Sequence, residues 1–219
     1  AGFTPLHIAV QQGHLNVCQY IIENISNKDP TNHAGYKPLY YAALFGHYEI
    51  CQLLIRNVED KNPSMTNKNN TPLHTAAQEG HFEICKLIIE NVVDKNPANN
   101  DGITPLHCAA QNNIHAGEGH FEICKLILEN VGDKNPLNNE GDTPLHIAAR
   151  NGIQKGSYEI CELIMDYVED KNPSNENGET PLHIAAQRGI YEILNLFIEN
   201  ACDKNPLDIM GDTPLHVAA

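Results

Sequence analysis

The chain has 219 residues and carries 28 acidic against 14 basic side chains, which gives a formal net charge of -14. A nucleic-acid partner is therefore not expected, because binding a phosphate backbone requires a basic stripe, and the lysines here are spread thinly along the chain. The sequence contains no apolar run long enough to cross a membrane and no signal peptide, so we expect a cytoplasmic, reducing location without membrane insertion.

The phrase Thr-Pro-Leu-His organises the sequence, because it begins at Thr4 and recurs along the whole chain. Further copies begin at Thr71, Thr104, Thr143, Thr180 and Thr213, and an altered copy, Lys-Pro-Leu-Tyr, begins at Lys37. The starts are separated by 33, 34, 33, 39, 37 and 33 residues. A fixed period of this length predicts a stack of similar units rather than one globular core.

Each copy predicts a turn followed by a short first helix. In the fourth copy Gly102 stands where a tight turn needs a positive φ, and the Thr104 hydroxyl can cap the helix that follows. Pro105 falls in the first helical turn, where its missing N–H removes no hydrogen bond. After this helix most copies carry a glycine that can supply a left-handed stop, such as Gly80 or Gly189.

A second, amphipathic helix is predicted in each copy, most clearly over residues 81–92. Apolar side chains recur there at helical spacing, at Ile84, Cys85, Leu87, Ile88 and Val92. The phrase Asp-Lys-Asn-Pro then ends this helix in most copies. Because a turn and two antiparallel helices cannot bury their apolar faces alone, the copies are expected to stack side by side.

Four copies depart from the pattern. The second carries apolar Leu44 and Phe45 where the other copies have polar residues, and the third has Asn69 in place of the turn glycine. The fourth and fifth copies are longer, by six and four residues, between their first and second helices. Because these copies are neighbours, we expect the two loops to stand side by side. They are either tolerated surface loops or a second contact site at Ile114, His115, Ile153 and Lys155.

The recurring phrase Gly-x-Thr-Pro-Leu-His-x-Ala-Ala-x-x-Gly-His-x-Glu-Ile closely resembles the ankyrin repeat, over essentially all 219 residues. The resemblance implies an all-α repeat solenoid, in which stacked helix-turn-helix units are joined by turns or β-hairpins. We expect residues 1–219 to form a single array of six full repeats and a partial seventh. Neither end has the polar character of a capping repeat, so we also expect a fragment of a longer protein.

One departure from the family is systematic. Ankyrin repeats usually close the second helix with a phrase of the Gly-Ala-Asp-Val-Asn type, whereas this chain has Asn-Val-x-Asp-Lys-Asn-Pro. We therefore expect the second helix to run longer than usual and to end less sharply.

The chain contains seven cysteines, which are interpreted as reduced and mostly buried. Equivalent atoms in neighbouring copies lie about 8 to 10 Å apart, one helix diameter, whereas a disulfide needs α-carbons within about 7 Å. Pairing in register is therefore excluded for the five that share one position of the second helix, Cys18, Cys51, Cys85, Cys124 and Cys161. Cys202 alone occupies a position that is polar in several copies, and we expect it to be the reactive thiol.

The twelve histidines do not predict a metal site, because they too are spaced one repeat apart. In ankyrin repeats the histidine of the Thr-Pro-Leu-His phrase is structural, and its ring bonds to neighbouring backbone. An active site is a convergent, unrepeated constellation, and no phosphate-binding loop or catalytic motif occurs. We therefore expect no cofactor, no metal and no enzymatic activity.

The resemblance implies that turn tips and first helices line a concave groove. The residue after the turn glycine changes along the groove from apolar to acidic, which favours a protein or peptide partner with an apolar anchor and a basic segment. The candidate partner-binding residues are Phe3, Tyr36, Leu44, Phe45, Ile103, Asp142, Glu179 and Asp212. We expect Tyr36, Leu44 and Phe45 to form one aromatic patch beside Phe3, with the alternative that Leu44 and Phe45 pack between copies. The alternative to such an adaptor is an architectural spacer in a larger membrane-associated or cytoskeletal protein.

Overall fold

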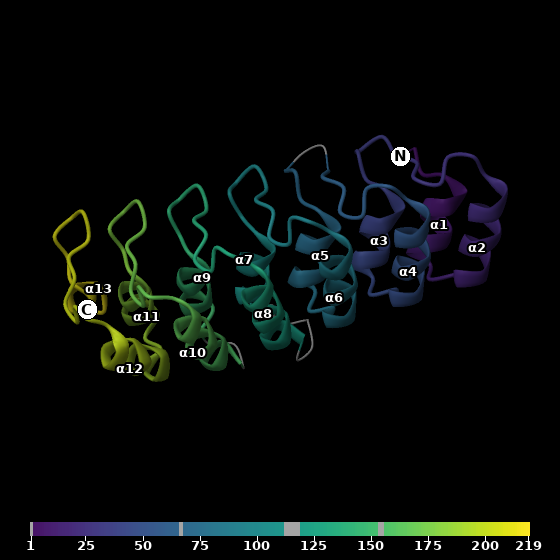
Figure 1. Cartoon of the computed structure of the whole chain (residues 1–219). Coiled ribbons are helices and arrows are strands. Elements are labelled where there is room, and N and C mark those ends of the chain that lie inside the picture. Colours follow the sequence, from purple (N-terminus) through teal and green to yellow (C-terminus); the bar gives the residue numbers. More distant parts are fainter. Residues whose placement is uncertain (1, 66–67, 112–118, 153–155) are drawn as a thin grey trace.

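The computed structural model describes residues 2–65, 68–111, 119–152 and 156–219, and within these ranges the regular elements are helices without any strand. Helix pairs stack side by side along the chain, and the turn loops all project to the same side (Figure 1). The predicted all-α repeat solenoid is confirmed. Its units are joined by turns, not by paired strands, in the described part of the chain. The two inserted loops, with Ile114, His115, Ile153 and Lys155, lie outside the described residues.

The first helices are short and begin at the proline of the repeated phrase. They are α1 (Pro5–Gln11), α3 (Pro38–Leu44), α5 (Pro72–Gln78), α7 (Pro105–Ala110), α9 (Pro144–Arg150), α11 (Pro181–Arg188) and α13 (Pro214–Val217). In all of these helices except α3, a threonine with an extended backbone precedes the proline and forms a capping box with the histidine at the third helical position, as Thr71 and His74 do. Helix α3 follows Lys37, which forms no side-chain cap. The predicted caps are therefore formed by the residues that the repeat provides.

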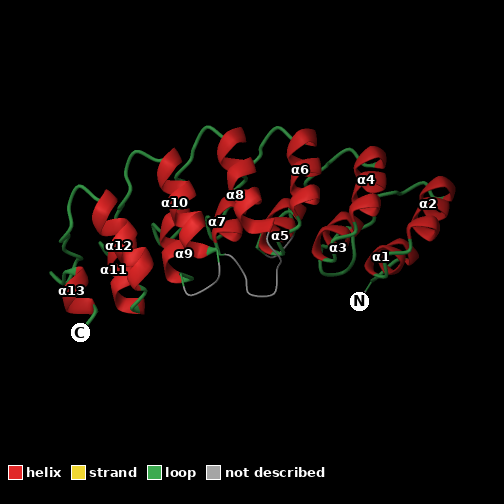
Figure 2. Ribbon diagram, turned by 90° about the horizontal axis from the view of Figure 1, so that it is seen from below, coloured by secondary structure: helices red, strands yellow, loops and turns green. Residues whose placement is uncertain are grey.

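The second helices are longer and cover the outer side of the array. They are α2 (Leu15–Asn24), α4 (Tyr48–Asn57), α6 (Phe82–Asn91), α8 (Gly119–Asn130), α10 (Ser157–Tyr167) and α12 (Tyr191–Asn200). Seen from below, the helices form two rows along an arc, with the first helices on its inner, concave side (Figure 2). The apolar faces of both rows meet in one continuous core along the array.

Stacking accounts for most of the burial. Ile84 of α6 faces the preceding repeat and is only 2% exposed, whereas Val17 holds the same position in the first repeat and is 48% exposed. Ile89 faces the following repeat and is 2% exposed, whereas Ile198 in the last full helix pair is 37% exposed. Each buried aliphatic side chain contributes about 1.5 to 3 kcal/mol, so the array is stabilised one interface at a time.

Two sets of histidines hold neighbouring repeats together. The first set lies in the repeated phrase and donates from Nε2 to a main-chain oxygen of the next repeat, over 3.0 to 3.1 Å, at His7, His74, His107, His146 and His183. The second set lies at the start of the second helices, just before α4 and α6 and in the first turn of α8. It bonds back to the first helix of the preceding repeat, at His47, His81 and His120. The structural role expected for the phrase histidines is confirmed by these bonds.

The end of the second helix differs from the expectation. The helix ends at a defined asparagine, because Asn57 donates from Nδ2 to the main-chain oxygen of Leu53 over 2.9 Å and Val58 then turns to extended backbone. Lys61 of the Asp-Lys-Asn-Pro phrase donates to the main-chain oxygens of Ile55 and Val58, which the helix leaves free. The expected less sharp ending was wrong, since the unusual phrase closes the helix with side chains.

The Asp and Asn of the Asp-Lys-Asn-Pro phrase lead to a hydrogen bond with the first helix of the next repeat. Asp60 accepts a hydrogen bond from the Asn62 main-chain N–H over 3.1 Å, and Asn62 in turn accepts from the main-chain N–H of Leu73 over 3.0 Å. The N–H of Leu73 lies in the first turn of α5 and has no partner inside that helix. The asparagine of one repeat therefore caps the helix that opens the next, and Asn96 does the same for Leu106.

Candidate partner-binding groove

The candidate groove is the surface of the turn tips, which project to one side (Figure 1), and of the first helices, which lie on the inner side of the arc (Figure 2). Neighbouring tips are joined by main-chain hydrogen bonds of 2.9 to 3.1 Å, from Asn100 to Lys68, Asn139 to Asp101, Glu176 to Glu140 and Ile209 to Asn177. These bonds make the tips a continuous rim from the third repeat onward. Side chains on the rim are therefore presented at fixed spacing.

The predicted aromatic patch is only partly formed. The rings of Phe3 and Tyr36 both contact Tyr41, with centroids 5.3 and 6.0 Å apart, and Tyr36 stacks on Tyr40 at 4.6 Å. Phe45 lies at the opposite end of α3, where its ring is 6.2 Å from that of His47. The expectation of one contiguous patch was wrong, because the seven residues of α3 separate Tyr36 from Phe45 by about 10 Å.

The members of the expected patch differ in exposure. Phe3 and Phe45 are 40% and 45% exposed, whereas Tyr36 and Leu44 are half-buried. The main-chain oxygen of Leu44 accepts a hydrogen bond from His81 over 3.3 Å, so Leu44 also takes part in repeat stacking. Phe45 is therefore the member of the set that is best placed for contact with another molecule.

Asp142 is not available as a groove carboxylate. Its side chain is 1% exposed, accepts a hydrogen bond from Arg150 Nη1 over 2.7 Å and accepts a second from Asn175 over 2.9 Å. Burial alone would raise the pKa of this carboxyl, but the bonds from Arg150 and Asn175 outweigh burial and hold the pKa below its usual value. We therefore correct the assignment of Asp142 from a partner contact to a buried, neutralised ion pair.

Glu179 and Asp212 belong to a larger acidic surface at the C-terminal end of the groove. The members share the turn segments of the last three repeats, and none forms an ion pair within the described residues; they are Glu140, Glu176, Glu179, Asp208 and Asp212. We call this set the acidic ridge. Two carboxylates nearer the N-terminus are neutralised instead, since Asp29 pairs with Lys37 and Asp101 with Lys68.

A cavity of about 560 Å³ opens in the groove between the fourth and fifth repeats. Its apolar lining comes from Ile103 beside the fourth turn, Cys108 of α7 and Ile147 of α9. Its polar lining includes Asp101, Asn138 and Glu140 from the tips and Gln111, Arg150 and Asn151 from the ends of the first helices. We call it the groove cavity. Of the eight candidate residues, only Ile103 is among the residues that line the cavity. Glu140, which was not a candidate, lines the cavity and also belongs to the acidic ridge.

Sequence reasoning missed most residues of the groove cavity. A signal for it was present, because Arg150 is the one basic residue at a position that holds glutamine in four other copies, Gln11, Gln78, Gln111 and Gln187. Its pairing with Asp142, eight residues earlier, explains the departure at Arg150.

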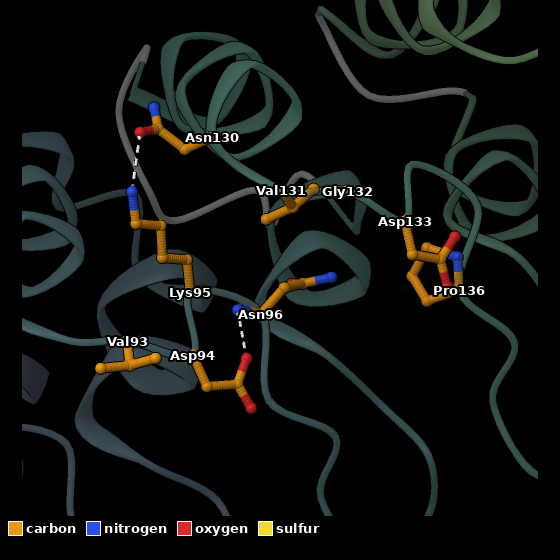
Figure 3. A pocket seen from close by; sticks show the side chains of 9 residues that line it. All are labelled: Val93, Asp94, Lys95, Asn96, Asn130, Val131, Gly132, Asp133 and Pro136. Carbon is orange, nitrogen blue, oxygen red and sulfur yellow. Dashed lines mark hydrogen bonds between the residues drawn. The ribbon is translucent and has the colours of Figure 1, made fainter.

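Figure 3 shows a second cavity, of about 300 Å³, between the segments that follow α6 and α8. Its polar groups already have partners, since Lys95 donates to Asn130 over 3.2 Å and Asp94 accepts from the Asn96 N–H over 3.1 Å. A similar cavity lies one repeat earlier, between the segments that follow α4 and α6. The second cavity therefore arises from the repeat itself and has no distinct chemistry.

Within the ranges that the structure describes, no group of three or more His, Cys, Asp or Glu side chains could hold a metal ion. The described helices include none that is long and apolar enough to span a bilayer. All seven cysteines are free thiols; Cys202 is exposed and the other six are buried. This distribution confirms the predicted burial pattern of the cysteines.

The comparisons with known proteins agree with this architecture. The family model for ankyrin repeats in three copies matches residues 1–65, 56–117, 114–172 and 152–219. The ankyrin repeat domain of Bcl-3, described as a member of the IkappaB protein family, is 25% identical, with a TM-score of 0.81 over 100% of this chain and 95% of that chain.

A second similar structure is an ankyrin repeat domain from Acinetobacter baumannii AYE. It is 25% identical, with a TM-score of 0.76 over 90% of this chain and 97% of that chain. A comparison with curated protein sequences finds no match. Since the family model covers the chain from end to end, this protein belongs to the ankyrin repeat family.

Proposed function

We propose that this array is an adaptor that holds a segment of a partner protein in its concave groove. Ankyrin repeat domains are generally protein-interaction modules and are typically non-catalytic. The proposed partner segment has an apolar anchor and a basic stretch, and the proposed setting is the cytoplasm. The residues proposed for contact are Phe3, Tyr36, Leu44, Phe45, Ile103, Glu179 and Asp212, with Glu140 added.

The observation that carries the proposal is the position of Glu140, which lines the groove cavity and also begins the acidic ridge. An apolar recess and a row of unpaired carboxylates are therefore continuous on one face. A segment that combines apolar and basic residues is complementary to both. Charges on such a rim act mainly on the association rate, whereas buried apolar anchors provide most of the affinity.

The test is selection of peptides from a random library displayed on phage. We expect enriched peptides that combine apolar with Lys or Arg residues and that bind less well to the variant Glu140→Lys/Glu179→Lys/Asp212→Lys. The control is Glu90→Lys/Glu129→Lys/Asp166→Lys, which makes the same charge change on the outer helices, where Arg56 shows that a cation is tolerated. Equal binding to both variants, or no enrichment at all, would favour the architectural spacer.

A further inference from the structure

Two turn asparagines donate a side-chain hydrogen bond to the preceding repeat, whereas Asn32 donates to the Tyr41 hydroxyl of its own repeat over 3.0 Å. Asn99 Nδ2 donates to Asn70 Oδ1 over 2.6 Å, and Asn175 Nδ2 donates to Asp142 Oδ1 over 2.9 Å. In both cases the acceptor is the side chain that follows the turn of the preceding repeat. The amide of one turn is therefore satisfied by a polar residue one repeat earlier.

Neither kind of acceptor is present at the groove cavity, where the position of Tyr41 is held by Ile147. The residue that follows the turn of the fourth repeat is Ile103, which has no side-chain acceptor to offer Asn138. Asn138 still uses Oδ1 to accept from the main-chain N–H groups of Glu140 and Asp142, over 2.9 and 2.8 Å. Its Nδ2 has no acceptor within the described residues, and Asn138 lines the cavity. An aliphatic floor and an unused amide donor thus occur together at one junction.

The charged residues that line the cavity favour a positively charged partner segment. Arg150 is neutralised by buried Asp142, and Asp101 by Lys68, so the unbalanced charge of the lining is that of Glu140. The acidic ridge extends this negative charge toward the C-terminal repeats. A basic segment is therefore complementary to the cavity, and an acidic segment is not.

We propose that the groove cavity receives an aliphatic side chain of a basic partner peptide, and that a main-chain oxygen of the peptide accepts the hydrogen bond from Asn138 Nδ2. The aliphatic side chain packs on Ile103, Cys108 and Ile147, and the flanking lysine or arginine residues lie along Glu140 and the acidic ridge. A volume of about 560 Å³ falls within the usual range of ligand sites, about 300 to 1,000 Å³. The inference rests on the proposed groove function and adds to it the place and chemistry of the anchor.

The test uses short capped peptides and NMR of the whole array. The probe is Lys-Leu-Lys-Lys, and its controls are Lys-Ser-Lys-Lys, which lacks the anchor, and Glu-Leu-Glu-Glu, which reverses the charge. We expect the probe at millimolar concentration to shift the side-chain amide of Asn138 and the methyl groups of Ile103 and Ile147. The two controls should leave these signals in place.

Two variants taken from the repeat itself sharpen the test. Ile103→Asn reproduces the residue found at Asn70 and gives Asn138 the acceptor that Asn99 has, whereas Ile147→Thr reproduces Thr75. We expect each to keep the melting temperature near that of the parent and to weaken peptide binding at least about tenfold. Because the two changes are independent, failure of one variant to fold leaves the other to decide.

Equal binding by the parent and both variants, or no binding of the probe, would overturn the assignment of the cavity. Shifts elsewhere on the concave side would overturn it too, while leaving the proposed function in place. The proposed function itself fails only if library selection yields no peptide that depends on the three groove carboxylates.

Discussion

His74 Nε2 donates a hydrogen bond to the main-chain oxygen of Ile103, 3.0 Å away in the next repeat. The other ring nitrogen, Nδ1, accepts from the main-chain N–H of Thr71 over 3.1 Å, so the neutral ring satisfies both bonds. Burial lowers the pKa of His74 to about 4, and it lowers that of His107 equally. The bond also fixes the backbone of the residue that forms the floor of the groove cavity.

A loss of stability is therefore expected at mildly acidic pH. Below pH 6.5 the unfolded chain protonates His74 and His107, while the folded chain keeps both neutral until about pH 4. The free energy of unfolding is then highest above pH 6.5 and falls as the pH drops toward 4, by about 1.4 kcal/mol per pH unit for each histidine. Urea unfolding midpoints measured between pH 7 and 4.5 test this. A midpoint that does not change across that window would contradict it.

The cysteines predict a simple labelling pattern. Burial raises the pKa of the Cys51 and Cys108 thiols to about 12, so neither forms the reactive thiolate at neutral pH. Cys202 is exposed. We expect a thiol reagent to modify one cysteine of the native array rapidly, and all seven after denaturation. A second rapid site, located by mass spectrometry, would show that a repeat interface opens more readily than the packing indicates.

Asn62 of the Asp-Lys-Asn-Pro phrase caps α5, and we expect this cap to stabilise the fold. Asn62→Ala removes the acceptor for the Leu73 N–H at the start of α5 and should lower the free energy of unfolding by about 1 kcal/mol. Asn62→Asp keeps an oxygen at this position and is the matched control. Denaturant unfolding of the parent and of the two variants gives the three free energies of unfolding. Equal losses of free energy in Asn62→Ala and Asn62→Asp would mean that the capping hydrogen bond is not the cause of the loss.

The ion pair of Asp142 and Arg150 permits a double-mutant cycle. Arg150→Gln leaves the buried carboxylate with only the Asn175 hydrogen bond and should cost about 2 kcal/mol of stability. The double variant Asp142→Ile/Arg150→Gln reproduces the combination that the fourth repeat already has, Ile103 with Gln111, and should recover most of that loss. If the loss of stability in the double variant equals the sum of the losses in Arg150→Gln and Asp142→Ile, the two residues act independently.

Much of the fold could be predicted from the sequence, because a fixed period repeats the same capping threonine, proline and turn residue. Thr71, Pro72 and His74 show this, since Thr71 and His74 form the capping box of α5 and Pro72 occupies its first position. The buried cysteines were predictable for the same reason, because their position on the second helix recurs.

The groove was harder to predict, because its chemistry depends on pairs of residues and not on single positions. From the sequence alone Asp142 is interpreted as an exposed carboxylate. The structure shows instead that it is buried and paired with Arg150. Tyr36 and Phe45 read as neighbours until α3 is seen to separate them. The sharp end of the second helix was missed because the Lys61 side chain reaches back to main-chain oxygens, which a pattern of residue types does not show.

The central claim is that a partner segment binds on the concave side, and hydrogen exchange of the array with and without a selected basic peptide tests it most directly. We predict protection in the turn tips and first helices of the repeats that carry the proposed contact residues, no change in α4, α6 and α8, and an association rate that falls as salt is added. Protection confined to the second helices, or an association rate that salt does not change, would contradict the account.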